Sequence, residues 1–219
     1  MSRIDGVVFD VNETLFSLDR LREAFADVDL DPGLVPLWFA GVLRDGFALT
    51  VLDCFTPFTA VAADNLRALD ARVDNRAVAT VLAAFRELTP HDDVEPALYR
   101  LHEAGIPAAT LSNGSAEGVQ ALLDRAGLTR YVSRNLSIDA VRRWKPAPEP
   151  YRYAATELGV EPQRLALVAV HPWDCAGAAA AGLTAGWVRR SQPHWPAMFP
   201  TPAVTGADLT AVVAALLAD

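Results

Sequence analysis

Short apolar runs alternate with helical patterns along much of this chain. Each run is too short for a helix and is bounded by turn residues, as expected of a buried strand. The four runs lie at residues 6–9, 107–111, 165–170 and 185–188. Strands that alternate with helices form a parallel sheet covered by helices on both faces. The pattern therefore predicts an α/β fold with a Rossmann-like, three-layer core around a parallel sheet.

The stretch between the first and second runs, from about residue 18 to residue 88, contains no strand signal. Apolar residues at three- and four-residue spacing predict four helices here, near residues 18–25, 37–47, 58–69 and 78–88. One crossover between parallel strands needs only one helix, so four in succession indicate a helical cap inserted after the first strand. The simpler alternative is a set of ordinary crossover helices. We assign residues 1–16 and 89–219 to the core and residues 17–88 to the cap.

The composition favours a small molecule as the partner. The chain has 219 residues, enough for one buried core with a small insertion. Its net charge is −8 and its 19 basic residues are scattered, so neither nucleic acid nor an anionic membrane is an expected partner. We find no signal peptide and no apolar run near the roughly 18 residues of a membrane span, which predicts a cytoplasmic protein. Apolar residues of the cap leave a homodimer open.

The two cysteines carry no recognisable motif. Cys54 and Cys175 follow neither metal-binding nor redox spacing. We expect both to be small buried residues in a reducing compartment.

Polar residues follow the first three apolar runs. They are Asp10 to Thr14, Ser112 to Ser115 and His171 to Asp174. In open parallel sheets the ligand site lies at the carboxyl ends of the strands. An Asp after a strand is often only a helix N-cap, which for Asp10 alone is an even alternative and for all the segments together a weak one.

Lys145 is the only lysine beside 18 arginines, and it lies in a proline-rich loop ahead of the third run. An arginine guanidinium is a planar fork, whereas a lysine ammonium is a compact point charge. A chain that otherwise uses arginine is expected to keep a lysine where the ammonium itself is needed, although one stray lysine must fall somewhere. We therefore predict that Lys145 meets Asp10 and Asp174 at one edge of the sheet.

These four segments, in this order and over nearly the whole chain, resemble the four motifs of the haloacid dehalogenase superfamily. In that family the Asp after the first strand is a nucleophile, and a Ser or Thr after the second binds the anionic group of the substrate. A Lys pairs with the nucleophile, and an acidic fourth motif completes the site. The resemblance implies these roles for Asp10, Ser112, Lys145 and Asp174.

Two positions bear on the branch of the superfamily. Its phosphatases carry a general-acid Asp two residues after the nucleophile, where this chain has Asn12, and a magnesium-binding Asp where this chain has Val170. A halide leaves as a stable anion and needs neither group. The resemblance is therefore to the type II 2-haloacid dehalogenases, which implies chemistry without a metal or cofactor. The stretch from Leu111 to Ser115, the pair Lys145-Pro146 followed by Tyr151, and the pair Trp173-Asp174 also resemble that branch.

The resemblance implies a two-step mechanism on short 2-haloalkanoic acids, giving 2-hydroxy acids. Asp10 attacks the carbon that bears the halogen and forms an ester. Water, activated by Asp174 and oriented by Lys145, then attacks the carboxyl carbon of Asp10. Thr14 and Ser112 fix Asp10 and the carboxylate of the substrate. The residues expected to border the substrate are Val11, Asn12, Phe39, Phe58, Asn113, Tyr151, His171 and Trp173.

Five positions depart from the pattern of that branch: Asn12, Glu13, Phe39, Ala169 and His171. Asn12 stands where the branch has a Tyr, and Ala169 replaces a small polar residue. Phe39 stands where the branch has an Arg that helps to bind the halogen, and Arg44 lies about 140° further around the helix, which predicts an exposed charge. Glu13 stands where the family has Gly. His171 replaces a small polar residue, and we expect it to hold the hydrolytic water or contact the halide rather than to be an ordinary buried histidine.

Two other functions stay open on the sequence. The first is a superfamily hydrolase acting on another small anionic substrate, such as a residual phosphatase with strong magnesium dependence. The second is a non-catalytic binding protein on a decayed fold. Against the latter stands the survival of Asp10, Lys145 and Asp174 together, because burying three charges without a chemical task is costly.

Overall fold

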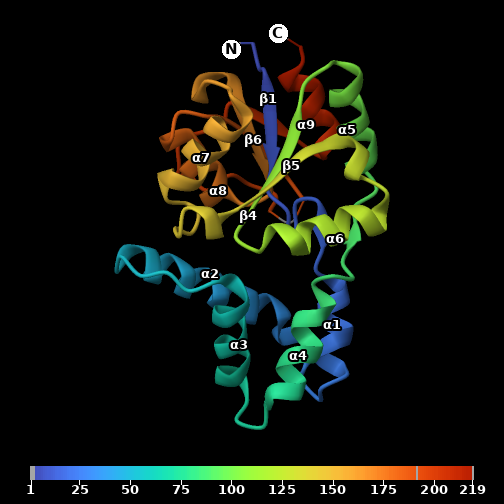
Figure 1. Ribbon diagram of the computed structural model, residues 1–219, viewed down its shortest axis with the longest axis vertical. Coiled ribbons are helices and arrows are strands. Elements are labelled where there is room, and N and C mark those ends of the chain that lie inside the picture. The colour runs from blue at the N-terminus through green and yellow to red at the C-terminus, as the bar shows by residue number, and fades with distance from the viewer. Residues whose placement is uncertain (1–2, 191, 219) are drawn as a thin grey trace.

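A six-stranded parallel sheet forms the centre of the computed structural model, which describes residues 3–190 and 192–218 (Figure 1). The strand order is β5-β4-β1-β6-β7-β8, and each neighbouring pair is parallel. The strands are β1 (Gly6–Phe9), β4 (Ala108–Ser112), β5 (Val132–Ser137), β6 (Leu165–Ala169), β7 (Thr184–Val188) and β8 (Val204–Gly206). Because all six run the same way, their carboxyl ends share one edge of the sheet.

Helices cover both faces of this sheet. Alternate residues of β1 point to opposite faces: Val7 and Phe9 join one apolar cluster and Val8 joins the other. The first cluster includes residues of α5 (Val94–Glu103), α6 (Ala116–Ala126) and α9 (Leu209–Leu216), and the second includes residues of α7 (Pro148–Leu158) and α8 (Pro172–Ala180). The predicted α/β class with a parallel sheet is confirmed.

All four predicted strands are present as β1, β4, β6 and β7. The pattern missed β5 and β8, which form the two edges of the sheet. In β5 the residues Ser133 and Arg134 are exposed, so the strand lacks a continuous apolar run, and β8 has only three residues. Edge strands give a weak hydrophobic signal because one side of the ladder faces solvent.

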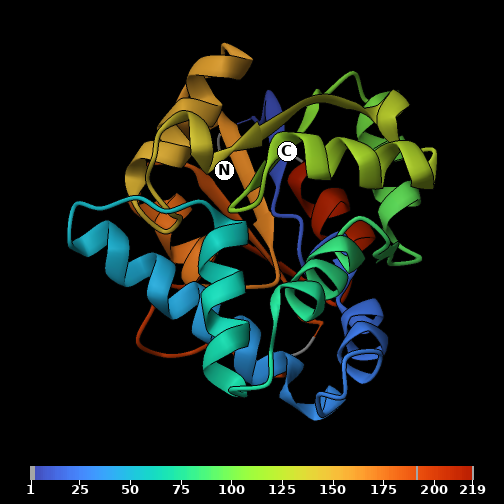
Figure 2. The ribbon, with the colours of Figure 1, turned by 60° about the horizontal axis from the view of Figure 1, so that its bottom comes forward.

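Four α-helices between residues 17 and 89 extend beyond the carboxyl edge of the sheet (Figures 1 and 2). They are α1 (Asp19–Ala26), α2 (Val35–Val51), α3 (Phe58–Leu69) and α4 (Asn75–Ala84). A small antiparallel pair, β2 (Phe16–Ser17) and β3 (Thr89–Pro90), joins the chain where it leaves and where it returns. Trp38 packs between Phe25 and Phe85 inside this group. We retain residues 17–88 as the predicted cap.

The expectation that no apolar run nears the length of a membrane span was wrong for this region. The segment from Pro32 to Val51 has 20 residues and a mean hydropathy of 1.4, so by length and composition it could cross a membrane. Arg44 and Asp45 interrupt the apolar residues and hide the pattern, although the average remains high. Buried core helices pass the same test, and Trp38, Phe39 and Val42 of α2 are buried.

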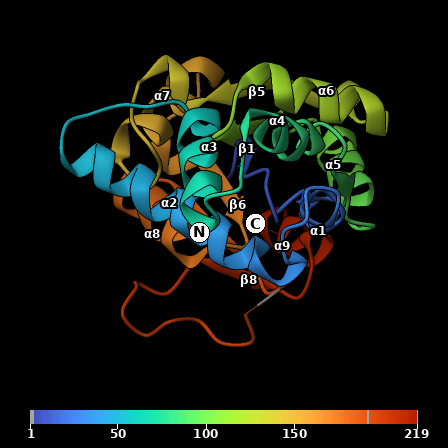
Figure 3. The same ribbon diagram turned by 90° about the horizontal axis from the view of Figure 1, so that it is seen from below.

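The loop that carries Lys145 is fastened to α2 and to the segment after it. The backbone N–H of Trp144 donates to Thr50 Oγ1 at 3.0 Å, and its indole Nε1 donates to the Thr56 carbonyl at 3.1 Å. Gly46 lies against the indole, where an added Cβ would sit 2.3 Å from a ring carbon. A bare backbone at residue 46 is therefore what lets α2 approach Trp144. Figure 3 views the molecule from below, with helices α1 to α4 toward the reader.

The cysteines differ from each other. Cys175 is buried as expected, but Cys54 is exposed and the expectation for it was wrong. It lies in the turn after α2, next to Asp53 with a φ of 58°. Residue type alone cannot reveal that the chain turns outward at this point.

Candidate active site

Asp10 lies directly after β1, at the carboxyl edge of the sheet, with 6 % of its surface exposed. Its Oδ2 accepts a hydrogen bond from Thr14 Oγ1 at 2.7 Å. The same Thr14 oxygen accepts from the backbone N–H of Val170 at 3.1 Å. The turn after β1 and the end of β6 therefore hold one carboxylate oxygen of Asp10 through Thr14.

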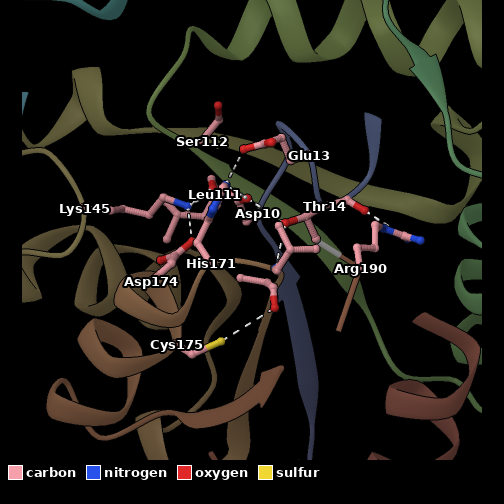
Figure 4. Close-up of polar contacts among 12 residues, drawn as sticks. Asp10, Glu13, Thr14, Leu111, Ser112, Lys145, His171, Asp174, Cys175 and Arg190 are labelled. Carbon is pink, nitrogen blue, oxygen red and sulfur yellow. Dashed lines mark hydrogen bonds and ion pairs between the residues drawn. The ribbon is translucent and has the colours of Figure 1, made fainter. Parts of the chain in front are cut away.

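Lys145 is fully buried and uses all three of its N–H donors (Figure 4). Its Nζ donates to Asp10 Oδ1 at 2.8 Å, to Asp174 Oδ2 at 2.6 Å and to the Leu111 carbonyl at 2.9 Å. The three acceptors come from the ends of three different elements, β1, β4 and α8. An ammonium has the right number of donors, while a guanidinium presents a flat fork of larger size.

Asp174 lies in the first turn of α8 and is completely buried. Lys145 occupies its Oδ2, and the hydroxyl of Tyr151 donates to its Oδ1 at 2.7 Å. Gly177, one turn further along α8, lies so close to Tyr151 Oη that an added Cβ would be 2.6 Å away. Tyr151 on α7 thus reaches Asp174 because α8 presents no side chain at residue 177.

Charge at the site favours an ionised pair. Burial by itself would raise the pKa of Asp10, but the positive charge of Lys145, followed by that of His171, brings this pKa below its ordinary value of 3.8. Burial would lower the pKa of Lys145, but the charges of Asp10 and Asp174 raise it above 10.5. For Asp174 burial dominates and raises the pKa, with Lys145 opposing the change.

Ser112 ends β4 and is buried, and its Oγ accepts from the backbone N–H of Gly114 at 2.8 Å. It lines a cavity of about 320 Å³ together with Val11, Asn12 and Phe58. Asn113 faces elsewhere, because its Oδ1 accepts from the backbone N–H of Lys145 at 3.1 Å. Asn113 therefore holds the lysine loop against the end of β4.

His171 and Trp173 stand at the start of α8, with their rings stacked at a centroid distance of 5.1 Å. The Trp173 ring meets Phe47 of α2 edge-on at 5.0 Å. His171 Nε2 lies 3.8 Å from Asp10 Oδ2 and 3.5 Å from Glu13 Oε2. The structure therefore places His171 beside the carboxylate of Asp10.

Phe39 and Arg44, two residues of α2, differ in their surroundings. Phe39 is buried, packs against Phe58 at 6.4 Å and lines a second cavity, of about 330 Å³, which also borders Glu13. Arg44 has a side chain that is 73 % exposed and pairs with its neighbour Asp45, as expected of a surface charge.

Comparison with known proteins agrees with this arrangement. A family described as haloacid dehalogenase-like hydrolase matches residues 4–182. The chain belongs to that hydrolase family. The (S)-2-haloacid dehalogenase of Pseudomonas sp. strain YL is 29 % identical over 97 % of this chain and 94 % of its own. The (S)-2-haloacid dehalogenase of Xanthobacter autotrophicus is 30 % identical over 85 % of this chain and 76 % of its own.

Solved structures give the same result. The structure of the L-2-haloacid dehalogenase from Xanthobacter autotrophicus has a TM-score of 0.88 and 26 % identity, covering 98 % of this chain and 99 % of that one. Likeness on this scale extends beyond the sheet and includes the helices between β1 and β4. The predicted family and enzyme class are therefore confirmed.

In this haloacid dehalogenase-like hydrolase, Arg190 makes contacts near the site that the sequence did not predict. Its guanidinium donates to the Thr14 carbonyl at 3.2 Å and to both oxygens of Asp93, at 2.6 and 2.9 Å. Arg190 follows β7, so the rule of looking beyond each strand end would have found it. Through this bond to the Thr14 carbonyl, Arg190 supports the turn that carries Thr14.

Val170 stands where the phosphatases carry their magnesium-binding Asp. Its backbone N–H donates a hydrogen bond to Thr14 Oγ1. Within residues 3–190 and 192–218, no group of three or more His, Cys, Asp or Glu side chains is arranged to hold a metal ion. Metal independence stays a prediction for this hydrolase.

The shifted pKa values predict a wide pH range for attack by Asp10. The acid limit of first-turnover halide release is expected below pH 3.8, where Asp10 finally accepts a proton, because its pKa is lowered. The alkaline limit is expected above pH 10.5, where Lys145 loses its proton, because its pKa is raised. Stopped-flow halide detection across the pH range measures both limits.

Fluorescence of the five tryptophans at each pH would separate loss of activity from unfolding. An alkaline limit well below pH 10.5 in a folded protein would show that the buried pair does not hold Lys145 in its charged form.

Proposed function

We propose that this enzyme is a hydrolytic dehalogenase of short 2-haloalkanoic acids that works through an ester on Asp10 and without a metal. One observation carries the proposal. A single buried ammonium, Lys145, joins the carboxylates of Asp10 and Asp174, while Asn12 and Val170 stand where phosphatases of the family carry acidic residues. The relatives named (S)-2-haloacid dehalogenases support this choice of substrate.

The first step is a displacement. A carboxylate oxygen of Asp10 gives an electron pair to the carbon that bears the halogen, and the halide leaves with the electrons of the broken bond. Lys145 and Thr14 hold the two oxygens of Asp10 from opposite sides, so the carboxylate cannot turn away from the substrate. Because the halide leaves as a stable anion, the reaction needs no proton donor at Asn12.

The second step is hydrolysis of the ester. A water molecule attacks the carboxyl carbon of Asp10, the bond between that carbon and the alkyl oxygen breaks, and a 2-hydroxy acid is released. Lys145 stabilises the negative charge that develops on the Asp10 oxygen it already contacts at 2.8 Å.

The substrate is assigned to the space beside Ser112. Its carboxylate would accept from the Ser112 hydroxyl and from loop backbone N–H groups ahead of α6, where the helix dipole favours an anion. Phe58 and Val11 line the same cavity and would contact the carbon chain. Phe39, which stands where the branch has an arginine, lines the second cavity and adjoins this space through its packing against Phe58. We also expect a cytoplasmic enzyme, and a homodimer through the cap remains a prediction.

The test is halide release from the two enantiomers of 2-chloropropionate and from fluoroacetate, with and without EDTA. We expect release from the (S) enantiomer at a rate that EDTA leaves unchanged, because Lys145 supplies the counter-charge that a metal would otherwise give. Release that EDTA abolishes and magnesium restores would contradict the metal-free mechanism. No release from any of these acids, together with magnesium-dependent hydrolysis of a phosphate monoester, would replace the proposal with a phosphatase.

A further inference from the structure

The first cavity, of about 320 Å³, lies between the cap and the core and includes the space assigned to the substrate. Ser112 and Ser115 border it from the core, and Leu82 and Ala83 of α4 border it from the cap. Of the described residues that line this cavity, Arg86 is the one with a charged side chain. A single positive charge therefore borders the space in which an anionic acid would bind.

The turn after α4 fixes the backbone of Arg86. Its N–H donates to the Ala83 carbonyl at 3.0 Å. The preceding residue, Phe85, packs edge-on against Phe58 at a centroid distance of 5.3 Å, and Phe58 lines the same cavity. Arg86 itself is exposed. The segment is thus anchored inside the cap by one aromatic residue, while the next residue stays at the cavity.

The guanidinium of Arg86 is not used to hold the fold together. Among the described residues it takes part in no ion pair, and its acidic neighbour Glu87 is paired with Arg20 at 2.8 Å. An arginine side chain has five N–H donors and no acceptor. These donors are available to an anionic ligand in the cavity.

The buried charges beside this cavity are unfavourable for an anionic substrate. With Asp10, Asp174 and Lys145 all ionised, two negative charges and one positive charge sum to −1. Ser112 offers only a neutral hydroxyl. His171, which can also carry a positive charge near Asp10, does not line this cavity. The carboxylate of a 2-haloacid would therefore enter against a net negative charge unless a further cation met it.

We propose that Arg86 binds the carboxylate of the substrate from the cap, while Ser112 donates to it from the core. The planar guanidinium matches the two oxygens of a carboxylate, and such a charge-assisted pair is stronger than the bond of a neutral hydroxyl. This inference rests on the proposed dehalogenase function and adds a positively charged contact to its substrate site. Because the carboxylate does not react, Arg86 acts on binding rather than on either chemical step.

The first variant, Arg86→Gln, removes the charge and keeps most of the side chain. We expect kcat/KM for (S)-2-chloropropionate to fall by about 10- to 30-fold while kcat changes by less than about twofold. Arg86→Lys keeps the charge but not the fork, so its loss should be only about threefold. Arg76→Gln is the matched control, because Arg76 is an exposed arginine of α4 that does not line the cavity. It should behave as the wild type.

A neutral substrate separates charge recognition from a structural role. The amide 2-chloropropionamide presents the same reacting carbon without the negative charge. Arg86→Gln should leave kcat/KM for this amide within about twofold of the wild-type value, because a neutral amide forms no ion pair with a guanidinium. A general disturbance of the fold would instead lower kcat/KM for the acid and the amide alike.

Binding without turnover gives an independent measurement. Isobutyrate has a methyl group in place of the chlorine of 2-chloropropionate and cannot be dehalogenated. Titration followed by protein NMR should show its Kd rise by about 10- to 30-fold in Arg86→Gln and stay unchanged in Arg76→Gln. Equal Kd values for the wild type and Arg86→Gln, or equal losses of kcat/KM for the acid and the amide, would overturn the assignment.

The same measurements distinguish this assignment from the proposed function. Wild-type protein that releases no halide, yet binds isobutyrate in a way that depends on Arg86, would refute the function and support the assignment. Normal halide release by Arg86→Gln with an unchanged KM would refute the assignment and support the function. Wild-type protein that neither releases halide nor binds isobutyrate would refute both.

Discussion

Replacing Asp10 with asparagine is expected to stop halide release, lowering the rate by at least about 10⁴-fold. An amide oxygen is a far weaker nucleophile than a carboxylate, and the other carboxylate bonded to Lys145, that of Asp174, is completely buried and also accepts from Tyr151. The fold should survive, because Lys145 keeps its bond to Asp174 at 2.6 Å and one buried negative charge is removed from a site that holds two. Halide release and thermal unfolding measure the two effects.

Asp5→Asn is a matched control, since Asp5 lies just before β1 and pairs with Arg164 at 2.7 Å on the surface. It should leave halide release unchanged. A single turnover of wild-type enzyme in heavy-oxygen water adds a second test. The label should enter the Asp10 carboxylate and not the product, because water attacks the carboxyl carbon. Label in the first product molecule would mean direct attack of water on the substrate.

Replacing Lys145 with methionine is expected to destabilise the fold by about 3–5 kcal/mol and to abolish activity. Methionine fills a similar volume but leaves Asp10 and Asp174 buried with no positive charge between them, and the Leu111 carbonyl loses its donor. Chemical denaturation measures the first effect and halide release the second. Lys145→Arg is also expected to abolish activity, because a planar guanidinium cannot donate to three acceptors that surround one point.

The double variant Lys145→Met with Asp174→Asn separates stability from chemistry. Asparagine still accepts the hydroxyl of Tyr151, so the double variant should recover about half of the lost free energy of unfolding while staying inactive. Recovery of activity in the double variant would show that Lys145 is structural only.

The interior strands and the cap helices were predictable, because their apolar residues follow the periods of a buried strand or an amphipathic helix. The edge strand β5 was not, since Arg134 and Ser133 break its apolar pattern and only pairing with β4 defines it. Cys54 shows the same limit, because exposure depends on where a turn sends the chain.

At the site, the convergence of Asp10 and Asp174 followed from acidic residues beyond two strand ends, and that of Lys145 from its being the only lysine in the sequence. The contact between Glu13 and His171 could be suspected from two unusual residues but not located, because it depends on a left-handed turn after β1. The use of all three donors of Lys145 depends on the Leu111 carbonyl, and no side-chain pattern reports a backbone acceptor.

Lys145 also has a consequence for handling this protein. The sequence contains one lysine, and folding removes it completely from solvent. Reagents that acylate primary amines therefore find no lysine on the folded surface and should couple through the α-amino group, giving a single attachment point for a resin or a dye. Acylation of Lys145 itself requires unfolding that exposes its amine, so the rate of acylation would report how often this site unfolds.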